Sequence, residues 1–167
     1  MAQGLAGVLL VVTSLLLTAV RADAETETVR DAYHLSGPAQ NLKRVTFSYR
    51  DDSAAIHIKM EHLSRKKTVL VAKYLRRDGI TIQVVTKYIR GNKRILVNSY
   101  DDTSFDSLSA KYAQAVWDFG RDVVRISIDQ ELLRGQRASF LAWSQEKDAM
   151  HGNPIGDFVS VTNLKRG

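Results

Sequence analysis

The chain has 167 residues, of which 44% are hydrophobic and 25% are charged, and it contains no cysteine. This apolar content excludes a disordered chain, and this length is typical of one domain with a buried core. The absence of cysteine excludes disulfides, thiolate nucleophiles, thiolate zinc sites and iron–sulfur clusters, and the formal net charge of +6 makes the protein basic.

The first 24 residues have the pattern of a secretory signal peptide. Residues 2–20 carry no charge and are mostly apolar, and Arg21 ends this run. Ala22-Asp23-Ala24 then places small residues at the two positions that signal peptidase reads. We expect cleavage after Ala24 and a secreted protein, extracellular or associated with the cell wall. An uncleaved membrane anchor is the alternative, because the run is just long enough to span a bilayer.

The remaining chain divides into an arm and a domain. Gly37-Pro38 predicts a break in the chain, so we expect residues 25–38 to form a flexible N-terminal arm and residues 39–167 to form the folded domain. No membrane span is expected after cleavage. Exported eukaryotic domains of this size usually carry disulfides, so their absence favours a bacterial protein that relies on its core.

Residues 42–100 alternate between apolar and polar side chains, which is typical of β-strands with one buried face. Turn-forming residues such as Asp78-Gly79 and Gly91-Asn92 separate the runs. The pattern predicts five strands in an antiparallel meander, near residues 45–49, 56–61, 68–75, 80–89 and 95–100. The run at 68–75 is apolar on both faces, as in a central strand.

The second half of the chain is less uniform. Residues 106–119 fit a helix by the spacing of Leu108, Tyr112 and Val116, but residues 113–117 also fit a strand. Further strands are expected at 123–128, 138–143 and 158–161, with a short turn or a single helical turn at 129–133. Eight or more such strands predict an all-β fold, an antiparallel β-sandwich of two packed sheets.

Several short segments carry a resemblance to a known group of proteins. These segments are Val116-Trp117-Asp118, residues 122–128, Leu132-Leu133 and residues 140–143. They resemble the C-terminal half of secreted actinobacterial β-sandwich proteins of unknown function, and more distantly the jelly-rolls of DOMON domains and of carbohydrate-binding modules of family 9. The resemblance implies a jelly-roll-like sandwich over residues 40–165 and a strand within 106–119.

The chain departs from that group in two ways. Asp129 stands where a proline commonly follows the strand, and the cysteine pair of many members is absent. Haem-binding members use methionine and histidine as axial ligands, and no such pair can be placed here, so no haem and no other cofactor is expected.

Charge is distributed unevenly along the chain. Residues 43–94 hold 14 Lys and Arg against 4 Asp and Glu, whereas residues 95–129 hold 3 against 6. Alternate turns of a meander lie at the same end, so the turns at 64–67 and 90–94 would gather Arg65, Lys66, Lys67, Arg90, Lys93 and Arg94. The other end would gather Asp51, Asp52, Asp78, Asp101 and Asp102, with Arg76 and Arg77 among them.

The basic cluster has two interpretations. It can bind an anionic cell-envelope polymer or an acidic polysaccharide, or it can keep the sandwich soluble and block edge pairing. Nucleic acid is not expected as a partner, because no motif of stacking aromatic residues accompanies the charge. The acid-rich end can hold Ca²⁺ through Asp101, Asp102 and Asp106, but aspartates that form turns explain the same pattern.

Aromatic residues are the other candidates for ligand binding. A flat, exposed aromatic ring can stack on a pyranose, and we consider Trp117 together with Tyr88 and Tyr100 as such a platform. Trp143 follows Phe140-Leu141-Ala142 and is expected in the core.

The sequence contains no recognisable catalytic motif. It has no serine elbow and no phosphate-binding loop, and its histidines lack metal-ligand spacing, so no catalytic or metal residue is expected. The sequence therefore favours a secreted, non-enzymatic binding module for a glycan or an anionic cell-wall polymer. The alternatives are a secreted hydrolase with an unrecognised carboxylate pair and a protein-binding or inhibitor module. The sequence leaves the oligomeric state open.

Overall fold

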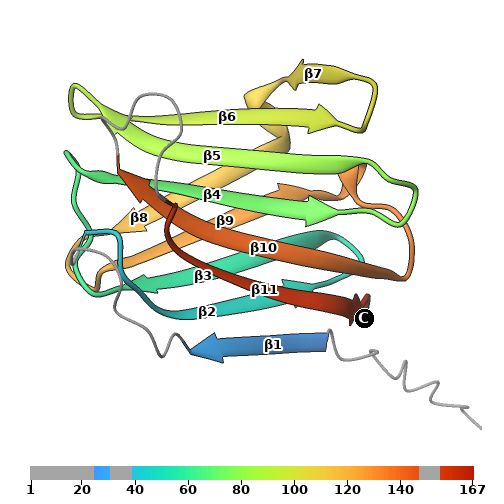
Figure 1. Cartoon of the computed structure of the whole chain (residues 1–167), viewed down its shortest axis with the longest axis horizontal. Coiled ribbons are helices and arrows are strands. Elements are labelled where there is room, and N and C mark those ends of the chain that lie inside the picture. Colours follow the sequence, from blue (N-terminus) through green and yellow to red (C-terminus); the bar gives the residue numbers. More distant parts are fainter. Residues whose placement is uncertain (1–24, 31–38, 147–154) are drawn as a thin grey trace, which may run out of the picture.

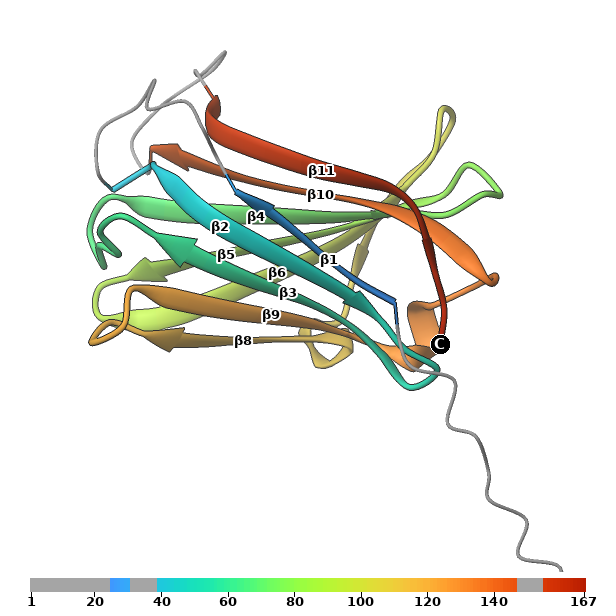
Figure 2. The same ribbon diagram turned by 90° about the horizontal axis from the view of Figure 1, so that it is seen from below.

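The protein forms two antiparallel β-sheets packed face to face, as the computed structural model shows (Figure 1 and Figure 2). The structure describes residues 25–30, 39–146 and 155–167, so the expected signal peptide lies outside the described residues. The elements are β1 (Glu25–Arg30), β2 (Leu42–Tyr49), β3 (Ser53–Met60), β4 (Thr68–Leu75), β5 (Thr81–Ile89), β6 (Asn92–Tyr100), β7 (Phe105–Leu108), η1 (Ala110–Tyr112), β8 (Ala113–Asp118), β9 (Val123–Asp129), η2 (Gln130–Leu132), β10 (Arg137–Glu146) and β11 (Ile155–Lys165). The predicted all-β sandwich is confirmed.

One sheet has five strands, in the order β1-β2-β3-β9-β8, and the other has six, in the order β11-β10-β4-β5-β6-β7. The predicted five-strand meander is wrong at one connection. β2 and β3 form a hairpin in the five-stranded sheet, and the chain then crosses to the six-stranded sheet, where β4, β5 and β6 are sequential neighbours. The crossing arises because β3 pairs with β9 rather than with β4.

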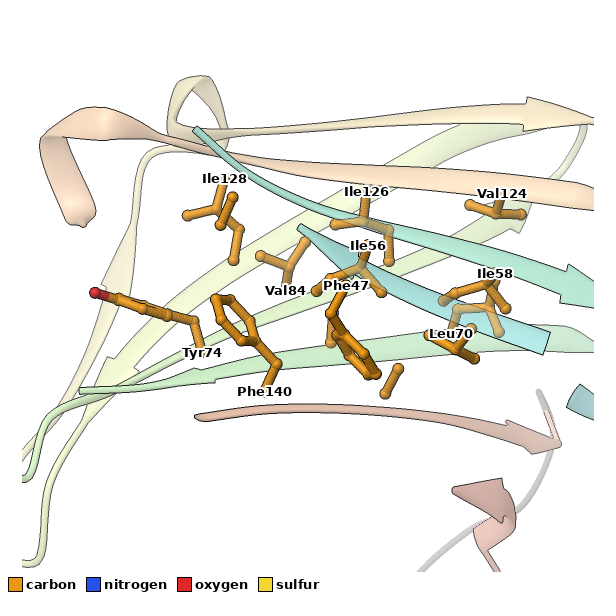
Figure 3. Close-up of a cluster of buried hydrophobic side chains, with 14 of the residues drawn as sticks. Phe47, Ile56, Ile58, Leu70, Tyr74, Val84, Val124, Ile126, Ile128 and Phe140 are labelled. Atoms are coloured by element: carbon orange, nitrogen blue, oxygen red, sulfur yellow. The ribbon is translucent and has the colours of Figure 1, made fainter. Parts of the chain in front are cut away.

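Alternating apolar side chains fill the space between the sheets (Figure 3). Phe47, Ile56 and Ile126 point inward from the five-stranded sheet and are fully buried. They meet Leu70 and Phe140 from the six-stranded sheet. β4 lies in the middle of its sheet and is buried on both faces over its first five residues, which confirms the central strand predicted at 68–75.

The region at 106–119 is a strand region and not a helix. β7 and β8 flank a single 3-10 turn, and the side chain of Val116 points outward and is 60% exposed. Leu108, Tyr112 and Val116 therefore do not form one buried side, as they would on a helix. The single helical turn expected near 129–133 is present as η2, capped by the Asp129 carboxylate, which accepts a hydrogen bond from the Glu131 amide at 2.9 Å.

The N-terminal arm differs from the expectation over its first residues. Residues 25–30 form β1, which pairs antiparallel with β2 in unbroken register from Glu25 opposite Tyr49 to Arg30 opposite Arg44. Its side chains are almost all exposed, so this edge strand is held by backbone hydrogen bonds and adds little to the core. No described residues form a helix long and apolar enough to cross a membrane.

Candidate functional site: the basic end of the sandwich

The turns gather at two ends of the sandwich, as the sequence predicted. The β3–β4 connection, the β5–β6 turn and the β8–β9 turn lie together at one end (Figure 1). We call this the basic end, and we define it by Arg65, Lys66, Lys67, Arg90, Lys93 and Arg94. The β2–β3, β4–β5 and β6–β7 turns lie at the opposite, acid-rich end.

The β5–β6 turn is tighter than expected. Ile89 pairs with Asn92 across a two-residue turn in which Arg90 has φ 51° and Gly91 has φ 81°. Two successive residues with positive φ are the hallmark of the turn that best matches the twist of a hairpin. Lys93 and Arg94 therefore lie in β6, on opposite faces of its sheet, and Arg90 projects from the tip.

An aromatic cluster closes the gap between the sheets at the basic end. The ring of Trp117 lies 5.1 Å from Tyr88 and 5.7 Å from Phe119, measured between ring centres. Its indole N–H donates to the Thr86 hydroxyl at 3.0 Å. Trp117 and Phe119 pack against the core from its margin and are half-buried. The cluster therefore joins β5 of one sheet to β8 of the other.

Two of the basic residues take part in this closure. The Arg65 guanidinium lies over the Phe119 ring at 4.5 Å and 5.9 Å from the Tyr88 ring centre, which are cation–π distances. The Lys93 ammonium donates to the Ala115 carbonyl at 2.6 Å. Arg65 and Lys93 therefore hold the loops in place as well as contributing charge.

The other four cations are free to meet a ligand. Lys66, Lys67, Arg90 and Arg94 are exposed, and none of the six basic-end cations forms an ion pair within the described part of the chain.

Carboxylates near the basic end already have other partners. Asp122 accepts the Leu63 amide at 2.9 Å and lies 4.0 Å from the Lys59 ammonium. Asp118 accepts the Arg121 amide at 3.0 Å, and the guanidinium of the same residue lies 3.7 Å from it. Glu61 accepts the Asn41 side-chain amide at 2.7 Å. None of these three carboxylates forms an ion pair with the six cations.

The acid-rich end is arranged differently, because two of its aspartates form ion pairs. Asp78 contacts Arg76, and Asp51 lies 3.5 Å from Arg166. Asp101 accepts hydrogen bonds from the Thr103 amide, the Thr103 hydroxyl and the Ser104 amide at 2.7–2.8 Å. These donors, the Thr103 amide first, lower the pKa of Asp101 to about 2. A turn-stabilising role therefore accounts for Asp101, and no group of three or more potential metal ligands occurs among the described residues.

The structure separates the three aromatic residues considered as a platform. Trp117 and Tyr88 contact each other at the basic end, on the inner side of their sheets. Tyr100 lies opposite Thr81, at the other end of β5, and packs against Phe105 on the outer face of the six-stranded sheet. The three residues therefore do not form one surface.

The expectation that Trp143 lies in the core is wrong. Phe140 and Ala142 are fully buried, so strand alternation places Trp143 on the outer face of the six-stranded sheet, opposite Phe158 of β11. Its indole N–H donates to the Gln145 side chain at 3.3 Å. The sequence could have predicted this, because residues 140 and 143 are three positions apart and so point to opposite faces of one strand.

A shallow cavity of about 170 Å³ lies on the five-stranded sheet, lined by Asp52, Tyr112, Gln114 and Asp129 among others. The carboxylates of Asp52 and Asp129 are exposed, and each accepts a hydrogen bond from a residue close to it in the sequence. Asp52 accepts the Ser53 hydroxyl, and Asp129 caps η2. A hydrolytic pair needs one carboxyl in an apolar setting, so this cavity gives no specific support to the hydrolase alternative.

No model of a protein family matches the chain, and a search of curated proteins finds no match.

Proposed function

We propose that this protein is an extracellular, non-enzymatic binding module that holds an anionic polymer at its basic end. The ligand class is an acidic glycan or another anionic polymer of the cell wall. The observation that carries the proposal is the contrast between the two ends. Within the described residues, the six cations of the basic end form no ion pair, whereas Asp78 and Asp51 at the opposite end pair with Arg76 and Arg166.

The geometry supports a polymer rather than a small anion. The cations come from the β3–β4 loop, the β5–β6 turn and the start of β6, so they are spread across the end of the six-stranded sheet. Exposed cations that are spread in this way match a chain of repeated negative charges. Arg65, held over Phe119, fixes the loop that carries Lys66 and Lys67.

The test is a salt titration of polymer binding. Poly-L-glutamate serves as the probe, and the variant is Lys66→Gln/Lys67→Gln/Arg90→Gln. Arg50→Gln/Arg77→Gln/Lys111→Gln is the control, because it removes the same charge from exposed positions at the acid-rich end, in the β2–β3 turn, the β4–β5 turn and η1. If each lost cation neutralised one charge, the slope of log affinity against log salt becomes shallower by about 2 in the basic-end variant, by analogy with single strands.

The control variant is expected to keep the wild-type slope. Equal changes in both variants would mean that net charge alone drives binding, and they would contradict a localised site. Binding that is insensitive to salt would also contradict the proposal.

A further inference from the structure

The outer face of the six-stranded sheet carries an apolar row that crosses five strands. Phe158, Trp143, Val71, Val85 and Leu96 are successive partners in register from β11 to β6. The row is about 19 Å long if neighbouring strands lie 4.8 Å apart. Phe158 is 64% exposed and Leu96 is 53% exposed, so large apolar side chains face solvent at both ends of the row, whereas Val71 in its middle is 2% exposed.

A polar row runs beside the apolar row. Lys73, Gln83, Asn98 and Ser107 are successive partners from β4 to β7. The Asn98 amide donates to the Gln83 side chain at 3.5 Å, and the Ser107 hydroxyl donates to Asn98 at 3.4 Å. These contacts are long, so the amide and hydroxyl groups retain capacity for a ligand's hydroxyls.

Aromatic rings lie on the far side of the polar row. Tyr100 and Phe105 stack with 6.3 Å between ring centres, and Phe105 is 64% exposed. The Lys73 ammonium lies 5.0 Å from the Trp143 ring centre and 5.2 Å from that of Tyr100, so it bridges the two aromatic groups. The outer face thus alternates aromatic, polar and aromatic strips.

The charge on this face is of one sign. Register places Lys73, Lys87 and Arg94 on it, and no Asp or Glu occupies an outward position on the described strands β4 to β6. A second copy of the chain would bring like charges together. A lipid surface would bury the polar row between two apolar strips, which costs free energy when such groups lose water without new partners.

We propose that this face is a second binding surface, for the pyranose rings of an acidic polysaccharide. The C–H faces of the sugar rings lie on Trp143 and Phe158, the hydroxyls bond to Gln83 and Asn98, and the acidic groups meet the cations. Lys87 and Arg94 lie where this face reaches the basic end, so one polymer chain can contact both. The negative charge of the ligand rests on the proposed function, whereas its sugar rings are inferred from this face alone.

The test compares two polyanions on the purified protein. Polygalacturonate carries carboxylates on pyranose rings, and poly-L-glutamate carries carboxylates without rings. We expect wild-type protein to bind polygalacturonate about tenfold more tightly at matched charge, since stacking on aromatic faces adds to the electrostatic attraction. Phe158→Ser/Leu96→Ser should remove this difference and leave poly-L-glutamate binding unchanged.

Val116→Ser is the matched control, because Val116 is 60% exposed on the outer face of the other sheet. It should change neither affinity. Equal wild-type affinity for the two polymers would overturn the inference, as would the same loss in the Val116 control. Loss of binding to phosphatidylglycerol vesicles in the double variant, with polygalacturonate binding intact, would assign the face to a membrane instead.

The two proposals fail separately in this design. If the preference for sugar depends on Phe158 and Leu96, and Lys66→Gln/Lys67→Gln/Arg90→Gln has no effect, the binding surface on the sheet is supported and the site at the basic end is contradicted. The reverse result would support the site at the basic end and contradict the binding surface on the sheet.

Discussion

A pair of buried tyrosines ties the sheets to the loop before β10, and its hydroxyls give a sharp test of the packing. The Tyr74 hydroxyl donates to the Arg134 carbonyl at 2.7 Å and accepts from the Arg134 amide at 2.8 Å. The Tyr49 hydroxyl lies 3.1 Å from it and donates to the Gly135 carbonyl at 2.8 Å. Both side chains are fully buried.

Tyr74→Phe removes one oxygen and keeps the ring, which packs against Phe140 at 5.3 Å between ring centres. No cavity of side-chain size is created, so the loss comes from the hydrogen bonds. The Arg134 amide, which donates in a part-buried hydrogen bond, loses its acceptor, and an amide left without a partner costs about 1–3 kcal/mol. Tyr49→Phe removes mainly a donor to a carbonyl, so we expect a smaller loss of about 0.5–1.5 kcal/mol.

Urea unfolding followed by far-UV circular dichroism measures both losses. The double variant should lose less than the sum of the two single losses, because the hydroxyls touch each other. Binding of polyanions should not change, since this pair lies at the acid-rich end. A Tyr74→Phe protein within 0.5 kcal/mol of wild type would refute the reasoning, because it would show that Arg134 is solvated and the loop is not held.

Three further predictions follow from charge and backbone geometry. Burial, followed by the hydrogen bond with Tyr74, raises the pKa of Tyr49 above its usual value near 10. Tyr49 therefore ionises in the unfolded chain before it ionises in the folded protein, and the free energy of unfolding falls above pH 10. Tyr49→Phe should reduce that fall in urea titrations at alkaline pH. Burial, followed by the charge of Arg125, lowers the pKa of His57 below 6.5. As the pH drops below about 6.5, the unfolded chain takes up this proton first, so the free energy of unfolding falls. His57→Gln should flatten this part of the plot of unfolding free energy against pH. Gly91→Ala places a side chain at φ 81° and should cost about 1 kcal/mol of unfolding free energy, with an unchanged melting temperature as the contrary result.

Strand positions in this protein could be predicted because side chains alternate in local sequence. The run at 123–128 has apolar residues at every second position, and it is β9 with Val124, Ile126 and Ile128 inside. The partners of each strand could not be predicted in the same way. The segment 64–67 looks like a hairpin turn, yet β3 pairs with β9, about seventy residues later, and the chain crosses between sheets.

The candidate site was predictable for charge and less so for aromatic residues. Turns that alternate between two ends still do so when the chain changes sheet, so the six cations of the basic end were placed together correctly. Tyr88 and Tyr100 lie on one hairpin in the sequence, but they point to opposite faces of the sheet and lie at opposite ends of the hairpin. The apolar row on the outer face depends on registers between β11, β10, β4, β5 and β6, which sequence alternation does not encode.

Amide chemical-shift mapping during titration with poly-L-glutamate tests the central claim most directly, because it shows which end of the sandwich meets the polymer. We expect the largest shifts at residues 64–67 and 90–94, with saturation that weakens as salt increases. Shifts confined to the turns at 50–52, 76–80 and 101–104, or spread evenly over both ends, would contradict a binding site at the basic end.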